Sequence, residues 1–266
     1  MPQVSNWLAE IDALSDRFSY ITELAVLGGE PLMHSEIQLI IDHILSKDNI
    51  HTVTLVTNGL LLERNTWIRE LQQKCNNLVV NISYHYDPNQ PSKYRNLMMR
   101  SMAKFSGFTE NKVLAHTKRI ALRATQTPTE LIPNVTLSVQ YPQSNQDKFT
   151  WKYPKLDHYD IPVRFNNNPV TAYNECLCPY IHYIGGKLYK CSVTGTLRTI
   201  LEMHNQLDEW PLLKHYKPYD LYADHDHTKF SDLFKSQDVC TYCPVGNQWR
   251  YDKTDKYSKI IHISEV

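Results

Sequence analysis

The residues in this chain with the most distinctive chemistry are its cysteines. The 266 residues include six, and none comes before residue 75: Cys75, Cys176, Cys178, Cys191, Cys240 and Cys243. The first ten residues lack the basic and apolar regions of a secretory signal. Cysteines clustered late in such a chain favour a metal site over a disulfide framework, and we expect a cytoplasmic protein. Cys75 stands apart from the cluster and is expected to pack as a small apolar residue.

A predicted β-hairpin brings some of the later cysteines together. Residues 180–190 have the pattern of two short strands around a Gly-Gly turn, so Cys178 and Cys191 should lie close to each other. Cys176 precedes Cys178 by two residues on an extended segment. It therefore points to the same face and could replace Cys178 as a ligand.

The last two cysteines, Cys240 and Cys243, form a Cys-x-x-Cys pair. Two thiolates at this spacing can bind one centre, because the intervening backbone amides turn inward and stabilise the charge on sulfur. Together with the thiolates of the hairpin they satisfy either tetrahedral zinc or a cubane iron–sulfur cluster. Buried free cysteines and a redox-active Cys-x-x-Cys are the alternative interpretations.

Helices and strands alternate in the first 85 residues, which predicts right-handed βαβ units and a parallel sheet. Ligands of such sheets bind beyond the carboxyl ends of the strands. The sequences GGEP (28–31), TNG (57–59) and SYHYD (83–87) lie at or directly after the ends of successive predicted strands, so all three should share this edge. The predicted helices cover residues 4–18, 35–46 and 63–74, and the predicted strands cover 21–27, 51–57 and 78–84.

The rest of the chain has a weaker pattern. One or two helices are expected over residues 92–124, a strand over 135–140, and a loop-rich segment over 141–175 with one short strand at 161–165. Lys and Arg total 28, as do Asp and Glu, so no general electric field attracts nucleic acid or an anionic membrane. No apolar run approaches the roughly 18 residues of a membrane span. We expect neither a nucleic-acid nor a membrane partner.

Three motifs taken together resemble the radical S-adenosylmethionine superfamily. LAVLGGEPLMH (24–34) resembles its GGEP motif, and VTLVTNGLLL (53–62) resembles its next strand with a TNG ending. CPYIHYIGGKLYKCS (178–192) with CTYCP (240–244) resembles the cysteine-rich extensions called SPASM or twitch domains. The resemblance covers most of the chain.

This resemblance implies an α/β fold in the form of a partial (β/α)6 barrel that lacks its first strand, with a small cysteine-rich extension. The barrel would comprise residues 1–170 and the extension residues 171–266. The extension would hold an auxiliary [4Fe–4S] cluster, whose implied ligands are Cys178, Cys191, Cys240 and Cys243, with Cys176 as the alternate.

The resemblance also implies a site for S-adenosylmethionine. Gly28, Gly29 and Glu30 match the stretch that binds the amino group of this cofactor, and a strand-end carboxylate can pair with an ammonium. Asn58 and Ser83 stand at the next two strand ends, where family members often contact the cofactor. Ordinary turn hydrogen bonding explains these two residues equally well. His85, Tyr86 and Asp87 extend into the same region, and nothing selects a role for them.

One defining feature of the superfamily, a CxxxCxxC loop before the first helix, does not occur in this sequence. We therefore expect this chain to perform no radical chemistry alone. It would be a truncated enzyme, a half completed by a partner protein that supplies the strand and loop, or a degenerate member. The substrate would be a peptide, a sugar or a small metabolite. A non-enzymatic zinc- or partner-binding module is the alternative function.

Overall fold

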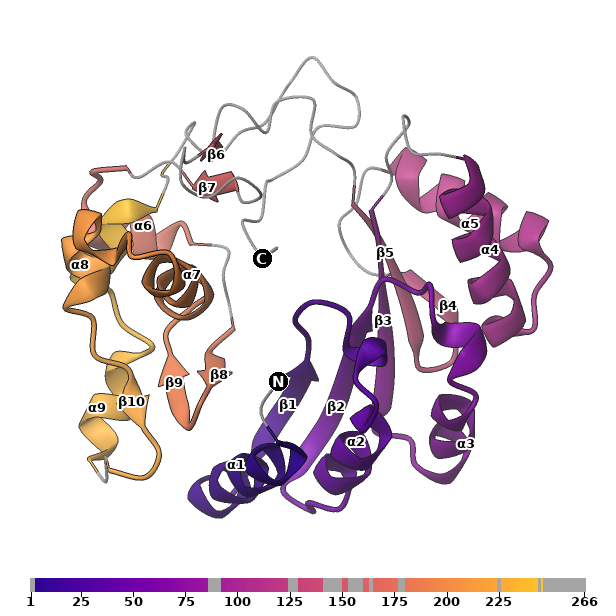
Figure 1. Cartoon of the computed structure of the whole chain (residues 1–266), viewed down its shortest axis with the longest axis horizontal. Helices are drawn as coiled ribbons and strands as arrows, with labels where there is room; N and C mark the ends of the chain where they lie inside the picture. The colour runs from indigo at the N-terminus through magenta and orange to yellow at the C-terminus, as the bar shows by residue number, and fades with distance from the viewer. Residues whose placement is uncertain are drawn as a thin grey trace. The chain divides into compact units, whose positions relative to one another are not determined.

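The chain folds into two compact units, which divide between residues 143 and 144. The computed structural model describes residues 3–85, 92–123, 129–140, 150–152, 160–162, 165–176, 180–223, 226–243 and 245. The division inferred from the resemblance, between residues 170 and 171, stays a prediction. Figure 1 shows the helices and strands of each unit with their labels.

The first unit alternates helices and strands as the sequence predicts. Its helices are α1 (Val4–Arg17), α2 (Ile37–Leu45), α3 (Trp67–Lys74), α4 (Ser92–Ser106) and α5 (Glu110–Arg123). Its strands are β1 (Ile21–Val26), β2 (Ile50–Thr57), β3 (Leu78–His85), β4 (Thr129–Ile132) and β5 (Val135–Gln140). They form one sheet in the order β1-β2-β3-β5-β4, in which β1, β2, β3 and β5 run parallel and β4 runs antiparallel to β5. The unit is thus a mixed α/β structure with a mostly parallel sheet.

The hydrophobic pattern of the strands explains which of them lie inside. Val53 and Leu55 of β2 and Val80 and Ile82 of β3 are fully buried, because helices cover central parallel strands. Ile41 of α2 is also fully buried in the same apolar cluster. β1 lies at the end of the sheet order and has exposed residues along its length.

The register of the sheet places the carboxyl ends of three strands at the same edge, with each strand ending two or three residues beyond the one before it. Val26 of β1 is opposite Leu55 of β2, and Thr57 of β2 is opposite Ile82 of β3. The residues that follow β1 and β2 therefore reach the same edge as the last residues of β3. This is the edge at which the sequence predicts a ligand site.

A buried glutamine ties the opposite edge of this unit together. Gln72 of α3 is 8% exposed, and its Nε2 donates to the carbonyls of Leu78 (3.2 Å) and Asn134 (2.9 Å). These carbonyls belong to the start of β3 and to the turn between β4 and β5. The side-chain amide thus donates one hydrogen bond to each of these two carbonyls and links the two segments.

The second unit is built from short elements around a three-stranded antiparallel sheet in the order β10-β9-β8. Its strands are β6 (Thr150–Lys152), β7 (Asp160–Pro162), β8 (His182–Ile184), β9 (Lys187–Tyr189) and β10 (Tyr219–Asp220). Its α-helices are α6 (Pro169–Asn174), α7 (Arg198–Met203), α8 (Pro211–Lys214) and α9 (His227–Asp232). A π-helical segment, η4 (Val193–Leu197), precedes α7, and a 3-10 helix, η6 (Asp238–Tyr242), contains the first half of the Cys-x-x-Cys pair.

The predicted hairpin is confirmed as β8 and β9 with a Gly185-Gly186 turn, and β10 extends it. Gly186 has a φ of +73°, and a Cβ there would lie 2.5 Å from the Tyr222 ring, so only glycine fits. The unit has a small apolar core of its own, which includes the buried residues Leu201 and Trp210. None of the helices described in either unit has both the length and the apolar character needed to cross a membrane.

Candidate functional site

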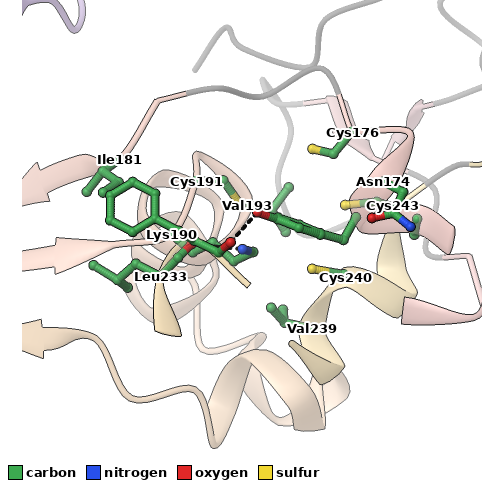
Figure 2. A pocket seen from close by; sticks show the side chains of 13 residues that line it. Asn174, Cys176, Ile181, Lys190, Cys191, Val193, Leu233, Val239, Cys240 and Cys243 are labelled. Carbon is green, nitrogen blue, oxygen red and sulfur yellow. Dashed lines mark hydrogen bonds between the residues drawn. The ribbon is translucent and has the colours of Figure 1, made fainter. Parts of the chain in front are cut away.

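A cavity of about 360 Å³ in the second unit is lined by four cysteines. Figure 2 shows the side chains of Cys176, Cys191, Cys240 and Cys243 around it, with Lys190 beside them. They come from three separate parts of the chain: the segment after α6, the turn after β9, and η6 with the residue that follows it. Four of the five predicted metal ligands thus line one cavity, and Cys178 lies outside the described residues.

Cys191 is held in a tight turn between β9 and the π-helical segment. Its backbone N–H donates to Thr194 Oγ1 (3.1 Å), and its carbonyl accepts from Gly195 N (3.0 Å). The Thr194 hydroxyl lies 3.8 Å from the Cys191 sulfur, and the neighbouring backbone amides of Val193 and Thr194 lower the pKa of the Cys191 thiol, against the larger effect of burial. Amide donors aimed at sulfur favour a charged thiolate, and this arrangement is typical of cysteines that bind metals.

The Cys-x-x-Cys turn is anchored to the segment before α6. Cys243 N donates to the Cys240 carbonyl (2.9 Å), which closes the turn. Asn167 holds it from outside: its Nδ2 donates to the Cys243 carbonyl (2.7 Å), and its backbone N–H donates to the Thr241 carbonyl (3.0 Å).

Helix α6 carries the fourth cysteine to this turn. Asn168 caps the helix, with Oδ1 accepting from Val170 N and Thr171 N, and Pro169 occupies the first turn. Cys176 follows the end of α6, where its N–H donates to the Tyr173 carbonyl (3.1 Å). The sequence NNPVTAYNEC therefore encodes both the anchor of the Cys-x-x-Cys turn and the position of Cys176.

Burial and crowding disfavour the charged form of three of these thiols. Burial raises the pKa of the Cys191, Cys240 and Cys243 thiols above their ordinary value. At Cys243, the neighbouring Cys191, Cys176 and Cys240 sulfurs raise the pKa further, whereas the Lys190 ammonium lowers it. In general, a metal cation that binds cysteine thiols replaces their protons.

The four cysteines surround the cavity without meeting at a single point. Within the ranges that the structure describes, no group of three or more His, Cys, Asp or Glu side chains is arranged to hold one metal ion. A zinc ion bound by four cysteines would require all four sulfurs at about 2.3 Å from it.

Lys190 is a feature of this site that the sequence reasoning missed. Lys190 is only 9% exposed, and its ammonium donates to the carbonyls of Leu233 (2.9 Å) and Lys235 (2.5 Å). It also lies 4.2 Å from the centre of the Tyr173 ring. Lys190 follows the buried Leu188 by two residues. Because side chains alternate between the two faces of an extended chain, this spacing could have placed Lys190 on the same buried face as Leu188.

The other candidate site is the carboxyl edge of the sheet in the first unit. Gly28 and Gly29 have φ values of +111° and +53°, and open space lies where their Cβ atoms would be. Their backbone can therefore be approached closely by a ligand. Asn58 Oδ1 accepts from Leu60 N (2.9 Å), and Ser83 lies in β3 near its end.

The carboxylate of Glu30 bridges the ends of β1 and β2. Oε1 accepts from Thr57 Oγ1 (2.7 Å) and Leu32 N (3.1 Å), and Oε2 accepts from Asn58 N (2.8 Å). These hydrogen bonds give Glu30 a structural role at the edge where the sequence predicts ammonium binding. The side chain of His85 is not described, and Tyr86 and Asp87 lie outside the described residues.

Comparison with known proteins provides no family assignment. No protein-family model matches the chain, and no curated protein sequence is significantly similar to it. The function must therefore be argued from the geometry of the two sites.

Proposed function

We propose that the second unit binds an iron–sulfur cluster through cysteine thiolates. The observation that carries this proposal is that Cys176, Cys191, Cys240 and Cys243, from three separate segments, line one cavity of about 360 Å³. Buried cysteines placed by chance would not be expected to converge from such distant positions. Cys178 competes with Cys176 for the fourth ligand position.

The size and shape of the cavity favour a cluster over a single zinc ion. Four sulfurs that bind one ion must converge on it, whereas the four cysteines described here line a cavity of about 360 Å³ without converging on one ion. In a [4Fe–4S] cluster each thiolate binds a different iron, so the sulfurs need not share one centre. When bound by four thiolates, such a cluster supplies one-electron transfer.

For the first unit we propose a partial barrel of the radical S-adenosylmethionine type. In its support, β1, β2 and β3 are parallel and adjacent in chain order, as in a barrel wound in one direction. S-adenosylmethionine would bind at the carboxyl edge, with its ammonium at the backbone of Gly28 and Gly29. The proposal extends to binding alone and assigns no cleavage of the cofactor to the described residues.

The test of the cluster is anaerobic reconstitution of the whole chain with iron and sulfide. We expect about four irons and four sulfides per chain, with broad charge-transfer absorption in the visible range. Cys240→Ser combined with Cys243→Ser should abolish both. Cys75→Ser is the matched control, because Cys75 lies in the first unit and donates to the Leu71 carbonyl. Cys176→Ser and Cys178→Ser, made separately, identify the fourth ligand.

A zinc site is the second candidate, and the same preparation distinguishes it. One zinc per chain after anaerobic purification, with no iron uptake on reconstitution, would overturn the cluster and support the zinc- or partner-binding module.

A further inference from the structure

The ammonium of Lys190 is a buried positive charge beside the four cysteines. Its hydrogen bonds go to two backbone carbonyls, and its third close neighbour is the ring of Tyr173. Throughout the residues that the structure describes, no carboxylate lies within ion-pair distance of it. Because a buried cation costs several kcal/mol unless an anion offsets it, an anion bound in this cavity would stabilise the ammonium of Lys190.

The sulfurs lining the cavity are the groups that can provide that negative charge. Lys190 directly precedes Cys191, and it lines the same cavity as Cys240 and Cys243. Its electrostatic effect reaches the sulfurs of both members of the Cys-x-x-Cys pair. Carbonyls of Leu233 and Lys235 fix the ammonium at the cavity wall.

We propose that Lys190 is the counter-ion of the cysteine-bound cluster and raises its reduction potential. This inference rests on the proposed cluster. An oxidised [4Fe–4S] core with four thiolates carries two net negative charges, and uptake of one electron increases this to three. A fixed positive charge stabilises the reduced form more than the oxidised form, because Coulomb attraction grows with the charge of the partner.

The reaction that this charge favours is a one-electron reduction of the cluster by an external low-potential donor, for which dithionite serves in the test. The electron enters the iron–sulfur core, no bond is broken, and the donor is oxidised by one electron for each cluster reduced.

Potentiometric titration of the reconstituted full chain, followed by electron paramagnetic resonance, tests the role of Lys190. At the wild-type midpoint, we expect Lys190→Met to lower the ratio of reduced to oxidised cluster at least about tenfold, which is about 59 mV for one electron. Lys190→Arg should keep the ratio within about twofold, because it keeps the charge. Lys187→Met is the matched control, since Lys187 is an exposed lysine at the start of β9, the strand that directly precedes Lys190.

The outcomes separate the two proposals. A wild-type chain that takes up no iron refutes the cluster itself. A loaded Lys190→Met protein with the wild-type midpoint refutes the counter-ion, as does an equal shift in Lys190→Arg and Lys190→Met, which would indicate packing and not charge. If Lys190→Met does not fold, Lys190→Gln makes the same comparison, because its amide still donates to the carbonyls of Leu233 and Lys235.

Discussion

Replacing Glu30 by glutamine removes the charge of the side chain and one of its two acceptor oxygens while keeping its size. In the wild type, Oε1 accepts two hydrogen bonds, from Thr57 and Leu32, and Oε2 accepts one, from Asn58. The single amide oxygen of glutamine can accept either from Thr57 and Leu32, in the place of Oε1, or from Asn58, in the place of Oε2. At least one charge-assisted hydrogen bond is lost, and an amide donor then faces another donor.

The expected cost follows from these contacts. A hydrogen bond to a charged group contributes about 1.5–3 kcal/mol, and Glu30 is only half-buried, so we expect Glu30→Gln to lower stability at this edge by about 2 kcal/mol. Hydrogen exchange of the β2 amides, followed by mass spectrometry, reports on the first unit alone. A loss of 2 kcal/mol corresponds to roughly 30-fold faster exchange where global opening limits it.

A matched control and a binding measurement complete this test. Glu36→Gln changes an exposed carboxylate and should leave exchange within about twofold of the wild type. Calorimetry with S-adenosylmethionine measures ligand affinity in the same variants. If Glu30→Gln exchanged like the wild type but lost binding of the cofactor, the carboxylate would serve the ligand, and our structural interpretation of its hydrogen bonds would be refuted.

Three other changes have expected outcomes. Gln72→Leu removes two hydrogen bonds, to the carbonyls of Leu78 and Asn134, and leaves the Asn134 carbonyl with the backbone N–H of Val80 as its donor; it should cost about 1–3 kcal/mol in denaturant unfolding of the first unit, and an unchanged midpoint would contradict this. Gly186→Ala forces a Cβ toward Tyr222 at a positive φ and should cost at least about 1 kcal/mol, which faster proteolysis of the second unit would reveal and a wild-type rate would refute. Burial lowers the pKa of His182 below its ordinary value of 6.5, so the unfolded chain binds more protons as the pH falls through about 6.5, and stability declines. Comparing thermal midpoints of the metal-free wild type and His182→Gln at pH 7 and pH 5 should show the smaller decline in the variant; equal declines would contradict the burial effect.

Much of the first unit could be predicted from the sequence because its periodicities are strong. The predicted helix at 4–18 and the predicted strands at 21–27, 51–57 and 78–84 agree with α1, β1, β2 and β3 to within one residue at each end. The predicted helix at 63–74 was wrong at its start, since α3 begins at Trp67. Asn65 explains this: its side chain donates to the Leu61 carbonyl and accepts from Trp67 Nε1, which favours a 3-10 turn before the helix.

Long-range contacts explain what the sequence could not predict. The antiparallel strand β4 gave no separate signal, because its four residues are defined mainly by pairing with β5. Helix α6 falls in a segment expected to be loop-rich, and its cap at Asn168 became visible only in the structure. Cysteine spacing did predict the grouping of the site, whereas the place of Lys190 depends on carbonyls more than forty residues later in the chain.

The separation of the four cysteines along the chain has a consequence for the lifetime of the protein. Cys176, Cys191 and the Cys240–Cys243 turn enclose loops of about 15 and 49 residues, around a small apolar core. A cross-link that closes a loop of about 15 residues reduces the conformational entropy of the denatured chain by the equivalent of about 3 kcal/mol, and a metal clip acts in the same way. If the second unit binds the proposed cluster, the loaded protein should be degraded by proteases more slowly than the unloaded one. The lifetime of the protein would then depend on the supply of iron and sulfide.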